Sequence, residues 1–435
     1  MKLFPRTTTY DLPLVLVVLA LLLLGLAMVY SASGITALDA NEDPGMFLAQ
    51  QSAWAALGIA AMLVAARVDY HRLRLFAVPL LLLAVALLVA VLVPGVGVTA
   101  GGATRWLRFG GLVGLQPAEL AKLALIVYLA TWLGARRDDI GSWRVTVPFV
   151  LITMLVLGLV VAEPDLGTAI VIVVVALAIY FAAGARLEIF IALGVLTGVS
   201  VLALAVVNPE RYERLLTFVD PWSDPRGAGF QTIQTLYALA LGGSFGEGLG
   251  AGREKFGYLP HPYTDSIFAV LGDELGLAGA LAVVLLFLVI AFRGVRIALH
   301  SEDATGALLA TGITVWLAFQ AWVNMAVVAS LVPMTGITLP FISYGGSSLC
   351  VGFIAVGILL NIGRHRGRFA PGAPAPAPPA PRGLAGAQPP RLSRAPRRWR
   401  DGRSRQPAPR GRGSPARNDA GHRVPLPRWS SRARG

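Results

Sequence analysis

Residues 208–268 read NPERYERLLTFVDPWSDPRGAGFQTIQTLYALALGGSFGEGLGAGREKFGYLPHPYTDSIF and form the one long polar interruption in a mostly hydrophobic chain. Loops longer than about 12–15 residues are usually either functional or disordered. This one holds too many Trp, Phe, Tyr and Leu residues to stay disordered. The stretch therefore predicts an ordered functional loop between membrane-spanning helices.

The rest of the chain has the composition of a membrane protein. Hydrophobic residues make up 55% of its 435 residues, and charged residues only 14%. Apolar runs of about 20 residues, the length of a helix that crosses a bilayer, recur from Leu12 to Ile362. These runs exclude a soluble globular protein and predict an all-α membrane protein with about ten transmembrane helices. The expected spans lie near 12–33, 50–66, 74–93, 117–134, 146–162, 167–183, 187–207, 266–292, 306–332 and 343–362.

The net charge of +13 is concentrated in the last part of the chain. Residues 363–435 hold 18 Arg and only two acidic residues, so the remainder of the chain is slightly acidic. This tail begins with the run PGAPAPAPPAP, typical of polyproline II, and it lacks the apolar residues of a core. We predict that 366–435 is a disordered cytoplasmic tail. It is either merely solvated or bound to anionic lipid or an acidic partner, and nucleic acid is not expected because no recognition module accompanies the charge.

Arginines alternate between successive connections of the predicted spans. Basic residues are most frequent in connections near 67–74, 136–144, 186 and 293–296, whereas Asp and Glu dominate several of the others. The positive-inside rule places the basic connections in the cytoplasm. Three parts follow: a cytoplasmic N-terminus at 1–11, a transmembrane domain at 12–365 whose large extracytoplasmic loop is 208–265, and the tail.

Glu119 and Lys122 are two ionisable residues near the start of the fourth predicted span. Their i, i+3 spacing places them on one face of a helix, where they can pair. Ionisable groups inside a membrane span are costly and usually face a partner or a cavity. Two interpretations stay open: a buried ion pair that fixes helix packing, or the wall of a polar cavity that receives a charged substrate.

Further candidate residues lie in the short outer connections. Arg105 and Trp106 follow a Gly-Gly pair; the indole suits the headgroup level, and an outward arginine suits a phosphate. Asp165 belongs to the acidic turn Glu163–Thr168, which is either a functional turn or a plain polar hairpin.

The long loop contains several local patterns. Gln231–Leu241 predicts a short helix along the membrane surface. The run Gly242–Gly250 is rich in glycine but lacks the Gly-Lys-Ser/Thr ending of a nucleotide-binding P-loop. Asp265 stands where the next helix begins, and it is either a helix N-cap or first-turn carboxylate or a functional group. The five histidines form no recognisable metal motif.

Five stretches together resemble the SEDS family of bacterial shape, division and sporulation proteins, typified by FtsW and RodA. They are, in order, RWLRFGGLVGLQPAELAKL, EPDLGTA, VDPWSDPRGAGFQTIQTLYALALGGSFGEGLG, REKFGYLPHPYTDSIFAVLGDELG and PMTGITLPFISYGGSSL. The resemblance covers the chain from Tyr10 to about His365 and leaves out the tail. It implies ten transmembrane helices and an enzyme, a peptidoglycan glycosyltransferase that polymerises Lipid II at the outer face of the cytoplasmic membrane.

The resemblance also implies roles and partners. The family's essential loop aspartate falls on Asp265, while Ser266, His261 and Tyr263 depart from the family pattern and put local packing in doubt. Glu119 and Lys122 would line a central cavity. The expected partners are a class B penicillin-binding protein that crosslinks the glycan and other membrane proteins of the division or elongation machinery.

The chemistry of glycosyl transfer from a lipid pyrophosphate agrees with these residues. It needs a base for the attacking sugar hydroxyl and a counter-charge for the leaving pyrophosphate. Asp265 is the candidate base. Arg105, Arg253 and Lys255 are the candidate counter-charges, and the resemblance leaves a divalent cation, Mg²⁺ or Mn²⁺, open as another.

Two rival functions remain: a Lipid II flippase, which intramembrane charges also suit, and a non-catalytic division scaffold. The Asp-Glu-Leu-Gly-Leu and Ser-Tyr-Gly-Gly-Ser-Ser-Leu stretches favour the septal FtsW subfamily over RodA.

Overall fold

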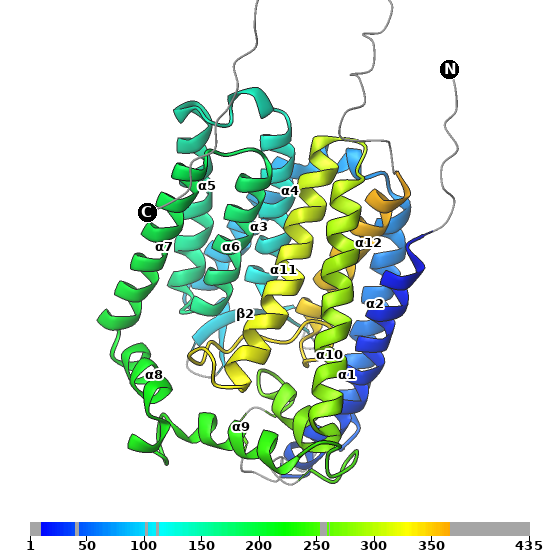
Figure 1. Ribbon diagram of the computed structural model, residues 1–435, viewed down its shortest axis with the longest axis vertical. Coiled ribbons are helices and arrows are strands. Elements are labelled where there is room, and N and C mark those ends of the chain that lie inside the picture. The colour runs from blue at the N-terminus through cyan, green and yellow to red at the C-terminus, as the bar shows by residue number, and fades with distance from the viewer. Residues whose placement is uncertain are drawn as a thin grey trace, which may run out of the picture. The chain divides into compact units, whose positions relative to one another are not determined.

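The computed structural model of the protein describes residues 10–39, 43–100, 103–109, 113–252, 259–260 and 262–365. Ten apolar helices dominate this part (Figure 1). They are α1 (Leu12–Asp39), α2 (Met46–Arg67), α3 (Leu73–Leu92), α4 (Pro117–Gly134), α5 (Trp143–Ala162), α6 (Leu166–Ala182), α7 (Leu187–Val207), α10 (Ile267–Leu299), α11 (Ala304–Val328) and α12 (Gly346–Arg364). Short 3-10 turns are η1 (Tyr70–Arg72), η2 (Arg137–Asp139) and η3 (Pro221–Ser223).

The predicted helical membrane fold is confirmed. Nine helices in the described ranges are long and apolar enough to cross a membrane, and α6, with 17 residues, is slightly too short for that criterion. Each predicted span corresponds to one helix, but α1 and α10 extend several residues beyond their predicted ends. The count of ten membrane crossings therefore stays a prediction.

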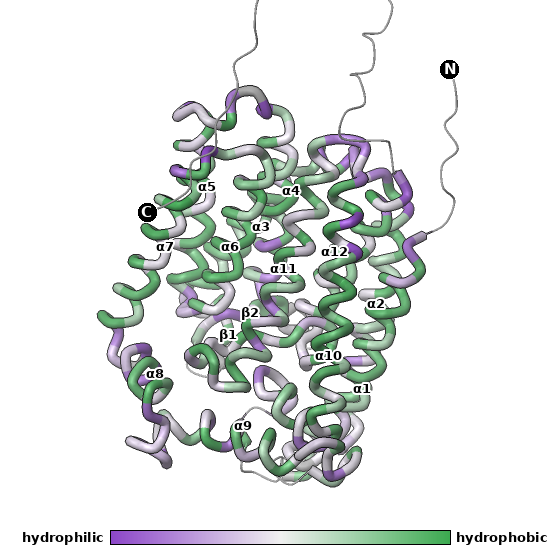
Figure 2. Tube along the Cα trace, viewed as in Figure 1, coloured by the Kyte–Doolittle hydropathy of each residue, from purple (hydrophilic) through white to green (hydrophobic). Residues whose placement is uncertain are grey.

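Successive long helices run in opposite directions, so their connections gather at two ends (Figure 1). The basic connections predicted to be cytoplasmic, near 67–74, 136–144 and 293–304, lie at one end. Asp265 and the 329–345 connection lie at the other. Apolar residues cover most of the helices, whereas polar residues concentrate towards their ends (Figure 2). Which end faces the cytoplasm stays a prediction from the charge pattern.

A small antiparallel sheet follows α3 and was not predicted. Its strands are β1 (Gly97–Ala100), β2 (Ala103–Phe109) and β3 (Val113–Leu115), in the order β1-β2-β3. Arg105 and Trp106, which the sequence places in an outer connection, both belong to β2. Since neighbouring residues of a strand point to opposite faces, the two side chains leave the sheet on different sides.

The long loop is largely helical where the structure describes it. It forms α8 (Pro209–Val219) and α9 (Phe230–Leu241), and the second confirms the short helix predicted from Gln231. Asn208 caps α8 by accepting a hydrogen bond from the Arg211 backbone N–H. Residues 253–258, His261, the first nine residues and the predicted tail from 366 onward lie outside the described residues.

The glycine-rich run after α9 packs against a break in α10. Gly276 has φ 65° and ψ −167°, which interrupts the helix, and a Cβ on it would clash with the backbone nitrogen of Gly246. Gly246 itself has φ 79°, and a Cβ there would clash with the carbonyl oxygen of Glu274. The glycines at these two positions therefore allow two backbones to touch. This close backbone contact explains the glycine at 246 within the glycine-rich run, and it requires no bound nucleotide.

We expect Gly276→Ala to destabilise the protein strongly. A side chain at this φ costs about 1–3 kcal/mol, and the contact with Gly246 adds a steric penalty. Gly194→Ala is the matched control, because Gly194 lies inside α7 and a Cβ added to it would have nothing within 4 Å. The control should be neutral or gain about 0.5–1 kcal/mol from helix propensity. Thermal unfolding in detergent measures both, and equal melting temperatures for the two variants would refute the close approach.

Candidate active site

Asp265 lies two residues before the first residue of α10 and is partly exposed. Its Oδ1 accepts a hydrogen bond of 3.2 Å from Thr264 Oγ1. Ser266, and not Asp265, occupies the N-cap position of α10. The interpretation of Asp265 as the helix N-cap is therefore wrong, and a functional role of its carboxylate stays a prediction.

The backbone around Asp265 is fixed by residues that come much later in the chain. Ser343 Oγ donates to the carbonyl of Thr264 at 2.6 Å, and the Tyr344 N–H donates to the carbonyl of Tyr263 at 2.8 Å. Asn324 Nδ2, on α11, donates to the carbonyl of Asp265 at 2.8 Å. Three consecutive carbonyls are thus held, so the backbone that carries the Asp265 side chain is well defined.

Two of the residues that depart from the family pattern have clear places in this packing. Ser266 is 1% exposed, and its hydroxyl accepts a 3.1 Å hydrogen bond from Gln231 Nε2 of α9. Tyr263 stacks at a tilt on Phe47, with ring centroids 4.9 Å apart, and meets the edge of Tyr344 at 5.8 Å. The substitutions therefore tie the loop to α9 and to the start of α2.

Glu119 and Lys122 form the predicted ion pair on α4. Lys122 Nζ lies 2.9 Å from Glu119 Oε1, and each residue is 3% exposed. The same ammonium donates to Gln320 Oε1 at 2.7 Å and lies 5.0 Å from the centroid of the Trp316 ring. The pair is therefore confirmed as a buried contact between α4 and α11, whereas a role in lining a substrate cavity stays a prediction.

A short connecting strip, residues 335–338, links this pair to Asp265. Gln320 Nε2 donates to the carbonyl of Thr338 at 3.0 Å, and Asn324 Nδ2 donates to the carbonyl of Ile337 at 2.7 Å. A Cβ on Gly336 would lie 4.0 Å from Asp265 Oδ2. Because Gln320 and Asn324 are one helical turn apart, one face of α11 holds the strip between Lys122 and Asp265.

Arg105 reaches from β2 to the turn after α5. Its Nε donates to the carbonyl of Glu163 at 3.1 Å, and one terminal nitrogen donates to the carbonyl of Pro164 at 2.5 Å. A guanidinium has five N–H donors, so three remain beyond these two bonds. Trp106 lies on the opposite face of β2, where a Cβ on Gly114 would lie 3.1 Å from its ring. The structure thus separates Arg105 and Trp106 and directs only the arginine to the turn.

Asp165 is the N-cap of α6. Its Oδ1 accepts from the Thr168 N–H at 3.1 Å, and its Oδ2 accepts from Thr168 Oγ1 at 2.8 Å and from Gln116 Nε2 at 3.2 Å. A Cβ on Gly167 would lie 2.7 Å from the carbonyl oxygen of Thr335, so this turn also packs against the connecting strip. The strip therefore lies beside Asp265 and the turn of Asp165, and Gln320 links it to Lys122.

Glu163 is a buried carboxyl beside this cluster. It is 0% exposed, and within the described part of the chain neither of its carboxyl oxygens has a hydrogen-bond partner. Burial, reinforced by the charge of Asp165, raises the pKa of Glu163 to about 8, although Arg105 opposes the shift. Glu163 is therefore mostly protonated at neutral pH.

We expect Glu163 to make the protein less stable as the pH rises. Its folded pKa of about 8 exceeds the ordinary value of 4.5, so its contribution is complete below about pH 4.5 and is lost as the pH rises through 8. Glu163→Gln should flatten the fall of the melting temperature between pH 5 and 8. Glu213→Gln is the control, because it removes an exposed carboxyl from α8. Identical pH profiles for Glu163→Gln and the wild-type protein would contradict the burial of a neutral acid.

Several site residues escaped prediction from the sequence. Gln116, Glu163 and Ser343 lie within the stretches that resemble the family, but the sequence predicts no individual role for them, and Gln320 and Asn324 lie outside those stretches. The last two are polar residues spaced i, i+4 in an apolar run, which is itself a signal of a polar interior. The predicted counter-charges Arg253 and Lys255 lie outside the described residues. Within the described residues, no group of three or more His, Cys, Asp or Glu side chains is placed to hold a metal ion.

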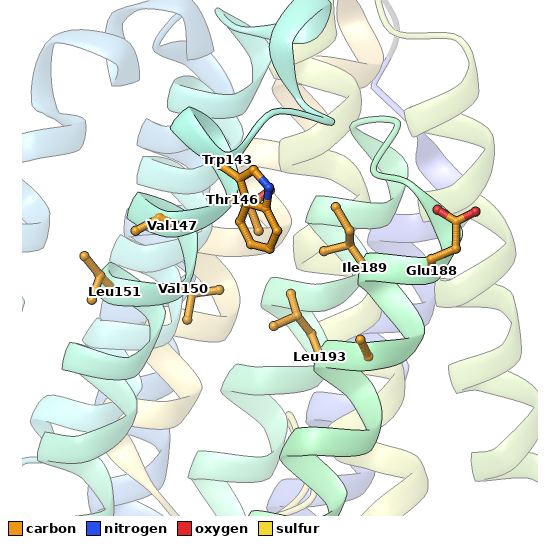
Figure 3. A pocket seen from close by; sticks show the side chains of 9 residues that line it. Trp143, Thr146, Val147, Val150, Leu151, Glu188, Ile189 and Leu193 are labelled. Atoms are coloured by element: carbon orange, nitrogen blue, oxygen red, sulfur yellow. The ribbon is translucent and has the colours of Figure 1, made fainter.

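Two apolar grooves open at the end of the protein opposite to Asp265. One, of about 510 Å³, lies between α5 and α7, and its walls include Val150, Leu151 and Leu193, with Trp143 and Glu188 at its end (Figure 3). The other, of about 380 Å³, lies between α2, α3 and α12. Neither contains a residue of the cluster around Asp265.

Comparisons with known proteins place these features in a family. The family model of FtsW, RodA and SpoVE, described as a cell cycle protein, matches residues 12–368. Stage V sporulation protein E of Bacillus subtilis strain 168 is 43% identical over 361 residues, which cover 83% of this chain and 98% of that protein. A protein of Geobacter metallireducens named "Probable peptidoglycan glycosyltransferase FtsW" is 44% identical over 355 residues, covering 81% of this chain and 94% of that protein.

Solved structures agree with the sequence relatives. A chain from a peptidoglycan synthase complex, described as coordinating polymerization and crosslinking, has a TM-score of 0.69 and 31% identity, and the match covers 82% of this chain and 98% of that chain. The rod shape determining protein RodA of Thermus thermophilus has a TM-score of 0.62 and 29% identity, and the match covers 84% of this chain and all of that chain.

Proposed function

Because the chain belongs to the FtsW, RodA and SpoVE family of integral membrane proteins, we propose that it is a peptidoglycan glycosyltransferase that polymerises Lipid II. The observation that carries the proposal is the fixed backbone at Asp265. Asn324, Ser343 and Tyr344 hold three successive carbonyls around it. The adjacent strip is held by Gln320, which also accepts from Lys122, and it packs against Gly167 in the turn of Asp165. A carboxylate held in this way at a helix start is suited to catalysis.

Asp265 acts in this proposal as the general base. A partly exposed carboxylate is ionised at neutral pH and accepts the proton of the attacking sugar hydroxyl as the new glycosidic bond forms. The bond to the lipid pyrophosphate breaks in the same reaction, and the pyrophosphate leaves with its electron pair. The rigid backbone keeps the base in place between successive additions.

Arg105 stabilises the leaving pyrophosphate. The turn carbonyls of Glu163 and Pro164 occupy two of its donors and fix the planar guanidinium, which leaves donors for phosphate oxygens. The neutral state of Glu163 supports this role, because an ionised carboxylate there would compete with the phosphate for the positive charge. Arg253 and Lys255 are proposed as further counter-charges from the long loop.

A divalent cation, Mg²⁺ or Mn²⁺, stays a prediction. The residues that the structure describes include no set of three metal-ligating side chains.

The proposed partner is a class B penicillin-binding protein that crosslinks the new strand. The similarity to a chain from a complex that coordinates polymerization and crosslinking supports this pairing. We further propose that the substrate is Lipid II and that the protein works at the septum beside other division proteins. Relatives named FtsW support both parts of the proposal.

A flippase function is the alternative that the buried Glu119–Lys122 pair favours, because transporters place charges in this way.

The decisive experiment uses purified full-length protein with its partner, Lipid II and detergent, and resolves the products on a gel. Detergent removes the two sides of a membrane, so a flippase or scaffold produces no glycan strands. Long glycan strands that disappear when either protein is omitted are the expected result. Unchanged Lipid II, with both proteins folded and associated, would overturn the proposal.

A further inference from the structure

Gln51 is a buried amide in the second turn of α2, a helix that is otherwise largely apolar. Its side chain is 1% exposed, and a buried amide costs free energy unless its polar atoms are hydrogen-bonded. Both atoms have partners, because Nε2 donates to the carbonyl of Ser343 at 3.1 Å and Oε1 accepts from the Gly345 N–H at 3.3 Å. One side chain therefore holds the backbone on both sides of Tyr344, although Ser343 comes 292 residues later in the chain.

The backbone that this amide holds is the one that supports Asp265. The carbonyl of Ser343 and the N–H of Tyr344 belong to the same planar peptide unit, so a bond to the carbonyl also fixes the direction of the N–H. That N–H donates to the carbonyl of Tyr263, and the Ser343 hydroxyl donates to the carbonyl of Thr264. Two of the three carbonyls around the aspartate are therefore held by residues that α2 itself holds.

Residues 339–345 need such support because their backbone is strained. Phe341 has φ 65°, in the left-handed region that side chains rarely adopt, and it is 3% exposed. A strained backbone of this kind persists only where the surroundings fix it. The Leu339 N–H donates to Ser343 Oγ at 2.7 Å and closes the segment from within, while Gln51 holds it from outside.

The same face of α2 also meets this part of the protein through an aromatic ring. Phe47 lies four residues before Gln51, so the two side chains are on one face of the helix. The Phe47 ring centroid is 4.9 Å from that of Tyr263 and 5.3 Å from that of Tyr344. The aromatic contacts press the two segments together, and the amide of Gln51 sets the direction of the peptide between them.

We propose that Gln51 is a positioning residue for Asp265, which acts by holding the Ser343–Tyr344 peptide unit in the orientation that supports the backbone of the base. The inference rests on the proposed glycosyl transfer and deepens it, because it adds a residue of α2 that supplies no group to the reaction. Loss of the amide would displace the base without removing it. A displacement of about 1 Å in a reacting group can cost about 100-fold in rate.

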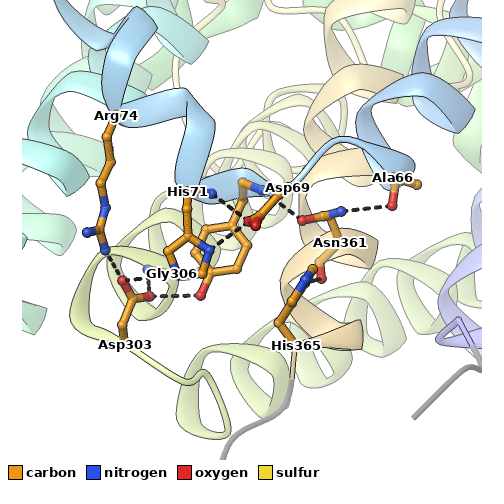
Figure 4. A network of polar contacts seen from close by, with 9 residues as sticks. Ala66, Asp69, His71, Arg74, Asp303, Gly306, Asn361 and His365 are labelled. Carbon is orange, nitrogen blue, oxygen red and sulfur yellow. Dashed lines mark hydrogen bonds and ion pairs between the residues drawn. The ribbon is translucent and has the colours of Figure 1, made fainter. Parts of the chain in front are cut away.

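Asn361 provides a matched control at the opposite end of the protein. It is also 1% exposed, and its amide holds two backbone groups of another segment: Oδ1 accepts from the Tyr70 N–H at 2.9 Å, and Nδ2 donates to the carbonyl of Ala66 at 2.8 Å (Figure 4). Asn361→Leu removes both bonds at similar side-chain size. Because each loss leaves buried backbone groups unpaired, Asn361→Leu and Gln51→Met should both lower the melting temperature.

The kinetic test separates positioning from stability. Gln51→Met keeps a long, flexible side chain but removes both hydrogen bonds. We expect kcat for Lipid II polymerisation with the partner present to fall by about 10–100-fold while KM stays close to the wild-type value, because the base acts on the transition state. Asn361→Leu should keep both constants. Gln51→Asn is a milder variant, one methylene too short to hold both groups, and should show the same pattern at a smaller amplitude if Gln51→Met does not fold.

Hydrogen exchange of the full-length protein in detergent, resolved to single amides by mass spectrometry, follows the contacts without substrate. Gln51→Met should speed exchange at Gly345, whose N–H loses its acceptor. It should also speed exchange at Tyr344 and Leu339, whose N–H groups bind to neighbours of the released peptide. Asn361→Leu should leave all three amides at their wild-type rates.

Three results would overturn the proposal: a wild-type kcat in folded Gln51→Met or Gln51→Asn, an equal loss of kcat in Asn361→Leu, or faster exchange at Gly345 alone. The proposed function fails separately. If the wild-type protein makes no glycan strands, that function is lost, while the exchange rates still decide whether Gln51 holds the backbone at Asp265.

Discussion

Asp265→Asn lowers the rate of Lipid II polymerisation by about 10²–10⁴-fold, the loss that commonly follows removal of a general base. Asparagine keeps the size of the side chain and the hydrogen bond from Thr264, and the backbone stays held by Asn324 and Ser343. The substitution therefore removes the proton acceptor with little change in structure. The measurement is strand synthesis by purified variant with its partner, at matched abundance and thermal stability.

A carboxylate elsewhere in the same loop provides the control. Glu213 is exposed on α8 and lacks contact with the connecting strip, so Glu213→Gln removes one negative charge without touching the site. It should polymerise at the wild-type rate. If Asp265→Asn did the same, the general-base role would be excluded and Asp265 would have only a structural function.

The Glu119–Lys122 pair carries the second large effect. Removal of one partner strands a buried charge, and we expect Glu119→Ala and Lys122→Ala each to cost about 3–5 kcal/mol of stability. The double variant should cost clearly less than the sum, because Gln320 Oε1 still accepts from Trp316 Nε1 at 2.7 Å. Thermal unfolding of the four proteins completes a double-mutant cycle. Additive effects would contradict the coupling.

The ion pair between Asp11 and Arg293 is the matched control for this cycle. Arg293 Nε donates to Asp11 Oδ1 at 2.9 Å at the opposite end of the protein, and Asp11 is buried. Its cycle should also show coupling in stability, but its double variant should keep the wild-type KM for Lipid II. A raised KM in the Glu119→Ala/Lys122→Ala double variant alone would then favour the cavity interpretation over a purely structural pair.

The helices were predictable because apolar runs of spanning length have few alternative structures. The ends of the helices were less predictable. The charge pattern suggested that the helix beginning at Ile267 ends near residue 292, where the apolar run stops. The helix continues to Leu299, and its last turns contain Arg293 and Arg296. Conversely, the break at Gly276 inside that helix follows from the approach of Gly246, a contact that sequence spacing alone does not reveal.

The sheet escaped prediction for a related reason. Gly97–Leu115 has short strands, several glycines and two arginines, so neither regular alternation nor a long apolar run marks it. The strands are stabilised by pairing with one another, as Val98 pairs with Trp106 and Leu107 with Leu115. Only this pairing separates Arg105 from Trp106, two neighbours that the sequence assigned to one loop.

The candidate site was predictable where chemistry is local. The i, i+3 spacing of Glu119 and Lys122 predicts their contact, since a helix alone brings them together. The surroundings of Asp265 are different, because Asn324 and Ser343 reach it only through the packing of α11 and α12. A single sequence holds no record of such distant contacts, although an amide and a hydroxyl in apolar surroundings show that polar partners must exist.

The order in which the chain is synthesised gives these late contacts a consequence. Thr264 and the hydroxyl that binds its carbonyl, on Ser343, are 79 residues apart. At about 5–20 residues per second, a ribosome reaches Ser343 roughly 4–16 s after Thr264. During that interval the aspartate has already been made but its backbone lacks its final supports. The proposed active site is therefore complete only after Asn324 and Ser343 have been made and have packed against the backbone at Asp265.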